Sequence, residues 1–384
     1  MFSLFRRWRS LRVRLAKPAI ICRNVNNSTY NKSCLLLYLT RPFLAGTPPN
    51  THQNVWQMKE LAKCIGECGY NVDVVDSFAR RTALVGHYDL VVDIHPKTKS
   101  VYSDRLAADC IKIAYMTSSH SDHRNSAERR RLDELERRRG VKLLPRRQME
   151  PINNTWLRLA DAMFFIGNQR NLSTYGENRP RHVYLIKNTG YDFLTPECFT
   201  HKNPNSFLFI ASGGQVHKGL DLVLEAFASR PYLELFVCSP FAEEEDFCST
   251  YNRELFETPN IHPVGYVDIG DRVFRQIADR CSFALLPSCS EANAGSVLTA
   301  MSAGVIPIVS RECGFDEGEV HYLRESTIDE IGTVADEYAQ KSLQWIVEEA
   351  ARIALVAKVR YGTEQYSKTV RAALSAVIDN RSRS

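Results

Sequence analysis

Residues 212–219 combine two adjacent glycines, Gly213 and Gly214, with a lysine, Lys218. They follow a short apolar run and precede a segment with helical spacing. Glycines let backbone amides approach an anion, and a lysine at a helix start adds a full positive charge, so this layout predicts a phosphate site. The spacing matches neither the Walker loop nor the dinucleotide pattern. The alternative interpretation is a flexible turn with a solvated lysine.

A second loop, residues 287–296, holds a lone carboxylate, Glu291, among small polar residues. It also lies between a predicted strand and a predicted helix. A carboxylate in such surroundings can accept hydrogen bonds from sugar hydroxyls or stabilise developing positive charge. Gly295 and Ser296 would add contacts to the same ligand. The alternative is a solvated loop glutamate.

The elements that must position these loops alternate between strands and helices. Predicted strands cover residues 34–40, 71–76, 89–94, 111–117, 162–167, 183–187, 207–211, 233–238, 261–267, 282–286 and 306–310. Predicted helices cover residues 51–68, 219–229, 243–256, 271–279, 296–303, 340–361 and 363–379. This order predicts an α/β protein with two Rossmann-like, doubly wound domains. Ligands bind at the carboxyl ends of strands in such sheets, so we expect a central cleft between the domains.

The length of 384 residues and the globular composition also favour two domains. We predict a basic N-terminal segment (1–30), an N-terminal Rossmann-like domain (31–190), a linker (191–204), a C-terminal Rossmann-like domain (205–340) and terminal helices (341–384).

Charge and cysteine content restrict the partners and the compartment. The net charge of +5 is small, and no nucleic-acid partner is expected. The mixed arginine and glutamate run at 128–139 indicates a solvated amphipathic helix, with acceptor binding as the alternative. The eleven cysteines include no Cys-x-x-Cys pair, which favours a reducing, cytoplasmic location.

Residues 1–17 combine six basic residues with aromatic and aliphatic ones. This pattern is typical of a helix lying on an anionic membrane surface, here the inner face of the cell membrane. A disordered tail is the alternative. No metal is expected, because His120 and His123 lack a third ligand and no Asp-x-Asp occurs in the chain.

The C-terminal half resembles the nucleotide-sugar domain of glycosyltransferase family 4, which has the GT-B fold. The matching segments are 217–227, which begins His-Lys-Gly, 290–310, which begins Ser-Glu, and 186–192. The resemblance is to bacterial surface-polysaccharide glycosyltransferases. It implies that Lys218 contacts the donor diphosphate, that Glu291 orients the donor sugar and that configuration is retained.

Two features depart from the family pattern. Thr299 stands eight residues after Glu291, where the family has a second glutamate that contacts ribose, so Thr299 is only a possible ribose neighbour. The family also tends to carry an arginine ahead of the lysine, and here the amides of Gly213 and Gly214 would take its place.

The sequence therefore predicts a glycosyltransferase of hexosyltransferase type. It would move a sugar from a nucleotide-sugar donor to a hydroxyl of a glycan or lipid-linked glycan, without a metal or cofactor. Glu291 and His120 are the catalytic candidates, with His120 on the acceptor side. The acceptor-side candidates at the first helix are His52 and Asn54. The alternatives are a non-catalytic GT-B-like scaffold and a membrane-surface binding protein.

Overall fold

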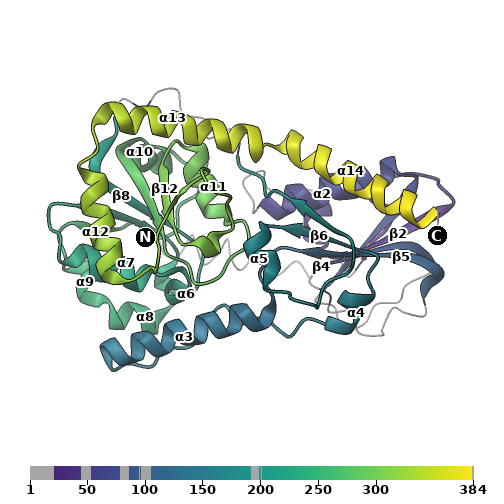
Figure 1. Cartoon of the computed structure of the whole chain (residues 1–384), viewed down its shortest axis with the longest axis horizontal. Helices are drawn as coiled ribbons and strands as arrows, with labels where there is room; N and C mark the ends of the chain where they lie inside the picture. Colours follow the sequence, from purple (N-terminus) through teal and green to yellow (C-terminus); the bar gives the residue numbers. More distant parts are fainter. Residues whose placement is uncertain are drawn as a thin grey trace.

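The computed structural model describes residues 21–44, 53–77, 86–94, 96, 105–191, 199 and 201–382. Two sheets, each flanked by helices, lie side by side along the long axis of the molecule (Figure 1). The strand order is β1-β3-β2-β4-β5-β6-β7 in the first sheet and β10-β9-β8-β11-β12-β13 in the second. Every pairing within these sheets is parallel except that of β1 with β3.

The N-terminal sheet forms because its strands are short apolar runs buried on both faces. Its strands are β1 (Ile21–Cys22), β2 (Lys32–Tyr38), β3 (Tyr70–Asp76), β4 (Tyr88–Ile94), β5 (Leu106–Met116), β6 (Ala162–Ile166) and β7 (Val183–Ile186). The helical segments of this half are η1 (Arg41–Phe43), α2 (Gln53–Glu67), α3 (Ser121–Arg139), α4 (Asn154–Leu159) and α5 (Gln169–Ser173).

The C-terminal sheet has the same parallel construction. Its strands are β8 (Asn203–Ile210), β9 (Glu234–Cys238), β10 (Ile261–Pro263), β11 (Cys281–Leu286), β12 (Ile306–Val309) and β13 (His321–Tyr322). The helical segments are α6 (Gln215–Lys218), α7 (Leu220–Ala228), η4 (Phe241–Glu243), α8 (Glu245–Thr250), α9 (Asn252–Phe256), α10 (Arg272–Arg280), α11 (Gly295–Ser302), η5 (Arg311–Cys313) and α12 (Ile328–Ala339). The single helix predicted over 243–256 is thus divided at Tyr251.

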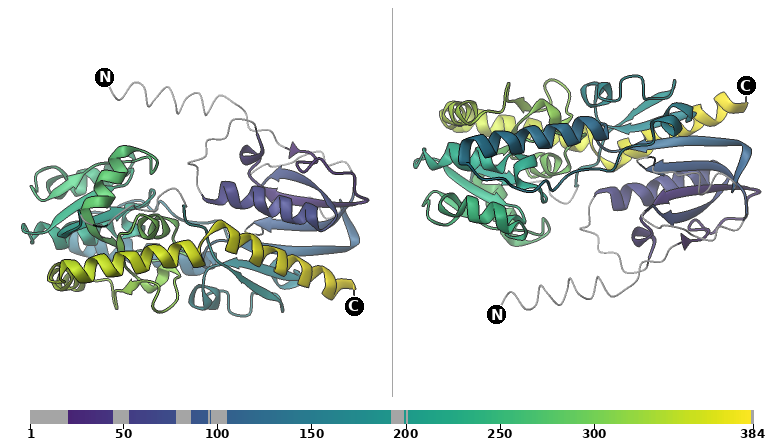
Figure 2. Two further views of the ribbon diagram at one scale, coloured as in Figure 1. Left: turned by 90° about the horizontal axis from the view of Figure 1, so that it is seen from above. Right: turned by 90° about the horizontal axis from the view of Figure 1, so that it is seen from below.

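Two long terminal helices connect the domains. The helix α13 (Leu343–Arg360) packs on the C-terminal core, whereas α14 (Thr363–Ser382) returns to the N-terminal domain, as Figures 1 and 2 show. Tyr366 of α14 shares a buried hydroxyl–hydroxyl hydrogen bond of 2.9 Å with Tyr115 of β5. The N-terminal domain therefore includes structure on both sides of the predicted range 31–190, because β1 precedes that range and α14 follows it.

The observed environment of α3 differs from the predicted one. It extends along the C-terminal domain (Figure 1), and Leu135 is part of the core of that domain. Arg138 and Arg139 form ion pairs with acidic residues of α7, to Asp221 at 2.7 Å and to Glu225 at 3.2 Å. The interpretation of this run as a solvated helix is therefore wrong for one face. The alternating charges gave no sign of the face that packs on the C-terminal domain. The apolar residues of the run on this face are two leucines, Leu132 and Leu135.

Several expectations concern segments outside the described residues. They include the surface helix at 1–17, His52 and most of the linker 191–204. None of the helices in the described part combines the length and the apolar character needed to cross a membrane. Each cysteine in the described part has a free thiol.

Candidate functional site

The glycine loop lies at the carboxyl end of β8, as predicted. Gly214 has φ of +88°, which favours glycine, and a side chain there would collide with Arg147. Its N–H donates to the Glu244 carboxylate at 2.5 Å, and the N–H of Gln215 donates to the same carboxylate at 3.2 Å. One of the two amides that were expected to bind phosphate, that of Gly214, thus already donates to an acidic side chain of the protein itself.

Lys218 and Glu291 form a buried ion pair across the ends of β8 and β11, which are neighbours in the sheet. Their side chains are only 6% and 12% exposed. Ser288 also donates to the Glu291 carboxylate, at 2.8 Å. Burial by itself raises the pKa of the Glu291 carboxyl, but the Lys218 ammonium and the Arg147 guanidinium outweigh it and lower the pKa to about 2. Glu291 is therefore ionised at neutral pH.

His217 lies beside this pair and is uncharged. Burial lowers its pKa to about 3. Its Nε2 lies 2.7 Å from the carbonyl oxygen of Ser290, which can only accept, so Nε2 carries the proton. The bond joins the glycine-loop segment to the Glu291 loop and fixes the distance between the two predicted halves of the site.

Two arginines that the sequence interpretation missed contribute positive charge. Arg147 lies against Gly214, and its Nε is buried without a hydrogen-bond partner in the described part of the chain. Arg124 of α3 donates from Nε to the Arg147 carbonyl at 2.9 Å. The positive charge that the glycine loop lacks ahead of Lys218 is thus supplied by the segment that begins with α3. No local signal marks these arginines, because they are brought there by the docking of α3.

The N-terminal domain also contacts the Glu291 loop directly. Ser119 donates to the Glu291 carbonyl from its N–H at 3.2 Å and from its hydroxyl at 2.7 Å. Gln53, at the start of α2, donates to the Gly295 carbonyl at 3.1 Å. Asn188 donates to the Asn293 carbonyl at 2.7 Å. The two domains are therefore in hydrogen-bond contact around the predicted donor residues.

The remaining predicted residues have other partners or surroundings. His120 is buried and caps α3: its Nδ1 accepts from the Asp122 N–H at 3.3 Å, and its Nε2 lies 2.9 Å from Asn154 Oδ1. Asn54 hydrogen bonds with Tyr38. The Thr299 hydroxyl donates to the Gly295 carbonyl at 3.0 Å, within its own helix.

The structure therefore brings Lys218 and Glu291 into contact, with Gly213 and Gly214 directly ahead of the helix that ends at Lys218. Gly295 and the partly exposed Ser296 form the start of α11, which follows the Glu291 loop. Within the described residues, no group of His, Cys, Asp and Glu side chains has the arrangement of a metal site.

No family model and no curated protein matches this sequence. Solved structures do match. HepE from Anabaena, in complex with UDP and glucose, has a TM-score of 0.52 at 12% identity, over 90% of this chain and 100% of HepE. Sucrose-phosphate synthase from Thermosynechococcus elongatus has a TM-score of 0.53 at 12% identity, over 92% and 98% of the two chains.

The apo structure of OtsA has a TM-score of 0.57 at 8% identity, over 91% of this chain and 98% of OtsA. These structures have the GT-B architecture of two parallel-sheet domains. The chain therefore has the GT-B fold, and the prediction of fold class is confirmed.

Proposed function

We propose that the protein is a glycosyltransferase of hexosyltransferase type that uses a nucleotide-sugar donor. The observation that carries the proposal is the buried Lys218–Glu291 pair, which lies at the carboxyl ends of two adjacent parallel strands and within contact of the other domain. Open α/β sheets bind ligands at such strand ends. The matched GT-B structures include HepE bound to UDP and glucose, which supports a nucleotide-sugar as the ligand.

In this proposal the donor diphosphate becomes the counter-ion of Lys218, Arg147 and Arg124. Glu291, released from Lys218, is then available to accept hydrogen bonds from the donor sugar. The acceptor hydroxyl replaces the nucleoside diphosphate at the anomeric carbon. The diphosphate leaves with the bonding electrons and takes up the proton that the hydroxyl loses. The protein's contribution is positioning and electrostatic stabilisation of the leaving group. The proposal includes no metal or cofactor, since these cations supply the positive charge.

The acceptor is proposed to be a glycan or lipid-linked glycan, and retention of configuration is proposed from the family resemblance. His120 and Asn54 belong to the N-terminal domain, which would bind the acceptor. His120 also has a structural role, because its Nδ1 caps α3 and its Nε2 lies 2.9 Å from Asn154 Oδ1 at the start of α4. A cytoplasmic location remains part of the proposal.

The test is a panel of nucleotide-sugars, read by thermal stabilisation and by donor turnover. A ligand that binds only the folded protein must raise its apparent stability. We expect selective stabilisation by one donor and its loss in Lys218→Met. No stabilisation by any donor, in protein shown to be folded, would favour the non-catalytic scaffold instead.

A further inference from the structure

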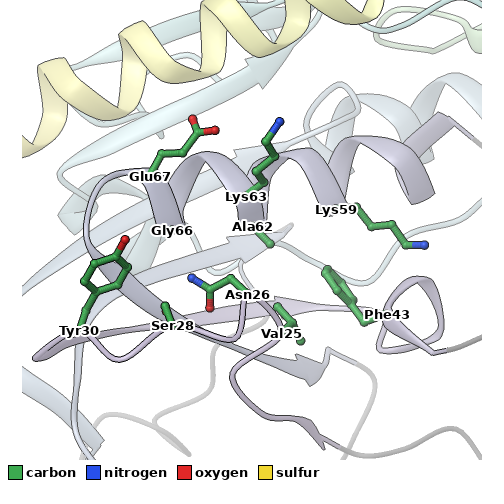
Figure 3. Close-up of a pocket in the computed structure, with 10 residues that line it drawn as sticks. All are labelled: Val25, Asn26, Ser28, Tyr30, Phe43, Lys59, Ala62, Lys63, Gly66 and Glu67. Atoms are coloured by element: carbon green, nitrogen blue, oxygen red, sulfur yellow. The ribbon is translucent and has the colours of Figure 1, made fainter.

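A pocket of about 620 Å³ lies outside the candidate donor site, on the N-terminal domain. One side is the stripe of α2 that presents Lys59, Ala62, Lys63, Gly66 and Glu67, and the other is formed by the loop from Val25 to Tyr30 together with Phe43 (Figure 3). Its size is within the range of small-molecule sites. Because Ala62 and Gly66 of α2 are small, an open space remains between the helix and the loop.

The loop side of the pocket is a built structure. Asn26 donates to the Tyr70 carbonyl at 2.8 Å and accepts from the Val72 N–H at 2.9 Å. The Ser28 hydroxyl donates to Asn71 Oδ1 at 2.8 Å. Because these polar groups already have partners, recognition of a ligand falls to the apolar side chains and to the lysines.

The acidic residues of α2 form closer ion pairs than its lysines do. Arg371 of α14 pairs with Glu67 at 2.7 Å and with Glu60 at 3.2 Å, and its hydrogen bond lowers the pKa of the Glu67 carboxyl. Lys63 has only a 3.8 Å contact with Glu60, and its side chain is 62% exposed.

Lys59 is exposed and has no ion pair within the described residues. In Figure 3 the Lys59 side chain extends toward the side of Phe43, whereas the Lys63 side chain extends from the other side of α2, away from the loop. The rim therefore carries the two positive charges of Lys59 and Lys63, and Arg371 balances one of the two negative charges of Glu60 and Glu67.

The apolar part of the pocket lies beside these lysines. Val25, Phe43 and Ala62 provide aliphatic and aromatic surface, and the Tyr30 ring lies at the other end beneath Glu67 (Figure 3). Two lysines four residues apart on one helix face match the charge of about −1.5 to −2 on a phosphate monoester better than the single charge of a carboxylate.

We propose that this pocket binds an amphiphilic phosphate monoester, with its apolar body on Val25, Phe43 and Ala62. The exposed side chains of Lys59 and Lys63 turn toward the phosphate when it binds. The proposal is independent of the proposed transferase activity. The site is also separate from the donor loops, since Lys59 lies six residues along α2 from Gln53, which corresponds to about 9 Å of helix.

Calorimetry on the full chain tests the proposal with three matched probes. Dihexanoyl phosphatidic acid, used below its micelle concentration, carries both the head and the chains. Glycerol 3-phosphate has the head alone, and dihexanoyl phosphatidylcholine has the same chains with a zwitterionic head. We expect phosphatidic acid to bind at least about tenfold more tightly than either control, because each control lacks one of the two contacts.

The double variant Lys59→Gln/Lys63→Gln should weaken that binding by about 30-fold, the effect of two lysines near a phosphate surface. A matched pair of exposed lysines, exchanged as Lys142→Gln/Lys358→Gln, removes the same net charge and should bind as the wild type does. Both variants change only exposed side chains, so folding is not at risk.

Three results would each overturn the proposal: no binding of phosphatidic acid, equal binding of phosphatidylcholine, or equal affinity of the two double variants. A monomeric amphiphile and a bilayer lipid share this chemistry, and vesicles containing phosphatidic acid distinguish them. Weaker vesicle binding by Lys59→Gln/Lys63→Gln than by the control pair identifies a bilayer lipid as the ligand. Equal vesicle binding by both pairs identifies a monomeric amphiphile.

Discussion

Lysines occur in two contrasting settings in this molecule. Lys218 is buried at the ends of two strands and has its own counter-ion, Glu291, whereas Lys59 and Lys63 lie exposed along an open pocket. A buried ammonium needs a partner, because an unpaired charge in the interior is costly. An anionic ligand of Lys218 must therefore displace a buried carboxylate, while a ligand of the pocket competes only with the 3.8 Å contact between Lys63 and Glu60.

The largest effect should follow from breaking the buried pair. Lys218→Met leaves Glu291 buried without its cation, so we expect the free energy of unfolding to fall by about 3–5 kcal/mol. Donor turnover should fall by at least about 100- to 1000-fold, since the leaving diphosphate loses its main positive charge. Denaturant unfolding and a turnover assay at a temperature where the variant is folded measure the two losses.

The double variant Lys218→Met/Glu291→Met separates stability from function. Replacing both charges by apolar groups of similar size removes the uncompensated carboxylate, so stability should recover while turnover stays absent. Turnover that recovers together with stability would show that the pair is structural only.

A second effect tests the docking of α3, which brings Arg124 to the candidate site. Leu135 is fully buried in the C-terminal core, so Leu135→Ala should lower the free energy of unfolding by about 3 kcal/mol. Leu144, which follows α3 and is 64% exposed, gives the matched control, and Leu144→Ala should change stability by less than about 0.5 kcal/mol. Equal effects of the two changes would contradict the docking.

The pH dependence of stability tests the uncharged state of His217. The pKa of this residue is about 3 in the folded protein and 6.5 for an unperturbed histidine. Below pH 6.5 the unfolded chain therefore binds a proton that the folded chain does not, and stability falls as the pH falls toward 3.

From pH 7 to pH 5 this difference costs about 2 kcal/mol. His217→Gln keeps an N–H donor for the Ser290 carbonyl and should lose that much less stability over the same interval. Parallel pH profiles for the wild type and the variant would disprove the assignment.

The smallest effect concerns the anion already present in the glycine loop. Glu244→Gln removes a negative charge from the amides of Gly214 and Gln215 while keeping an acceptor oxygen. If Glu244 competes with the donor phosphate, donor affinity should rise by about fivefold. A matched exchange at Glu243, the preceding residue, controls for net charge. Weaker donor binding in Glu244→Gln would show that Glu244 supports the loop instead of competing.

The order of elements in the fold could be predicted because buried parallel strands are short apolar runs with distinct ends. The loops that hold Lys218 and Glu291 could be found for the same reason, since each directly follows such a run. What the sequence could not reveal depends on long-range packing. Arg147 and Glu244 reach the glycine loop from other segments, and α3 docks through two leucines within a charged run. Alternating charges in a sequence indicate a solvent-exposed helix, and only the tertiary structure shows which of the charges are paired.

The central claim is that Lys218 exchanges Glu291 for the diphosphate of a donor. Calorimetry with a nucleoside diphosphate and its parent nucleoside tests it most directly, in the wild type and in Lys218→Met/Glu291→Met. The account predicts that the wild type prefers the diphosphate by more than about tenfold and that the double variant has no preference. An unchanged preference in a folded double variant would contradict the account.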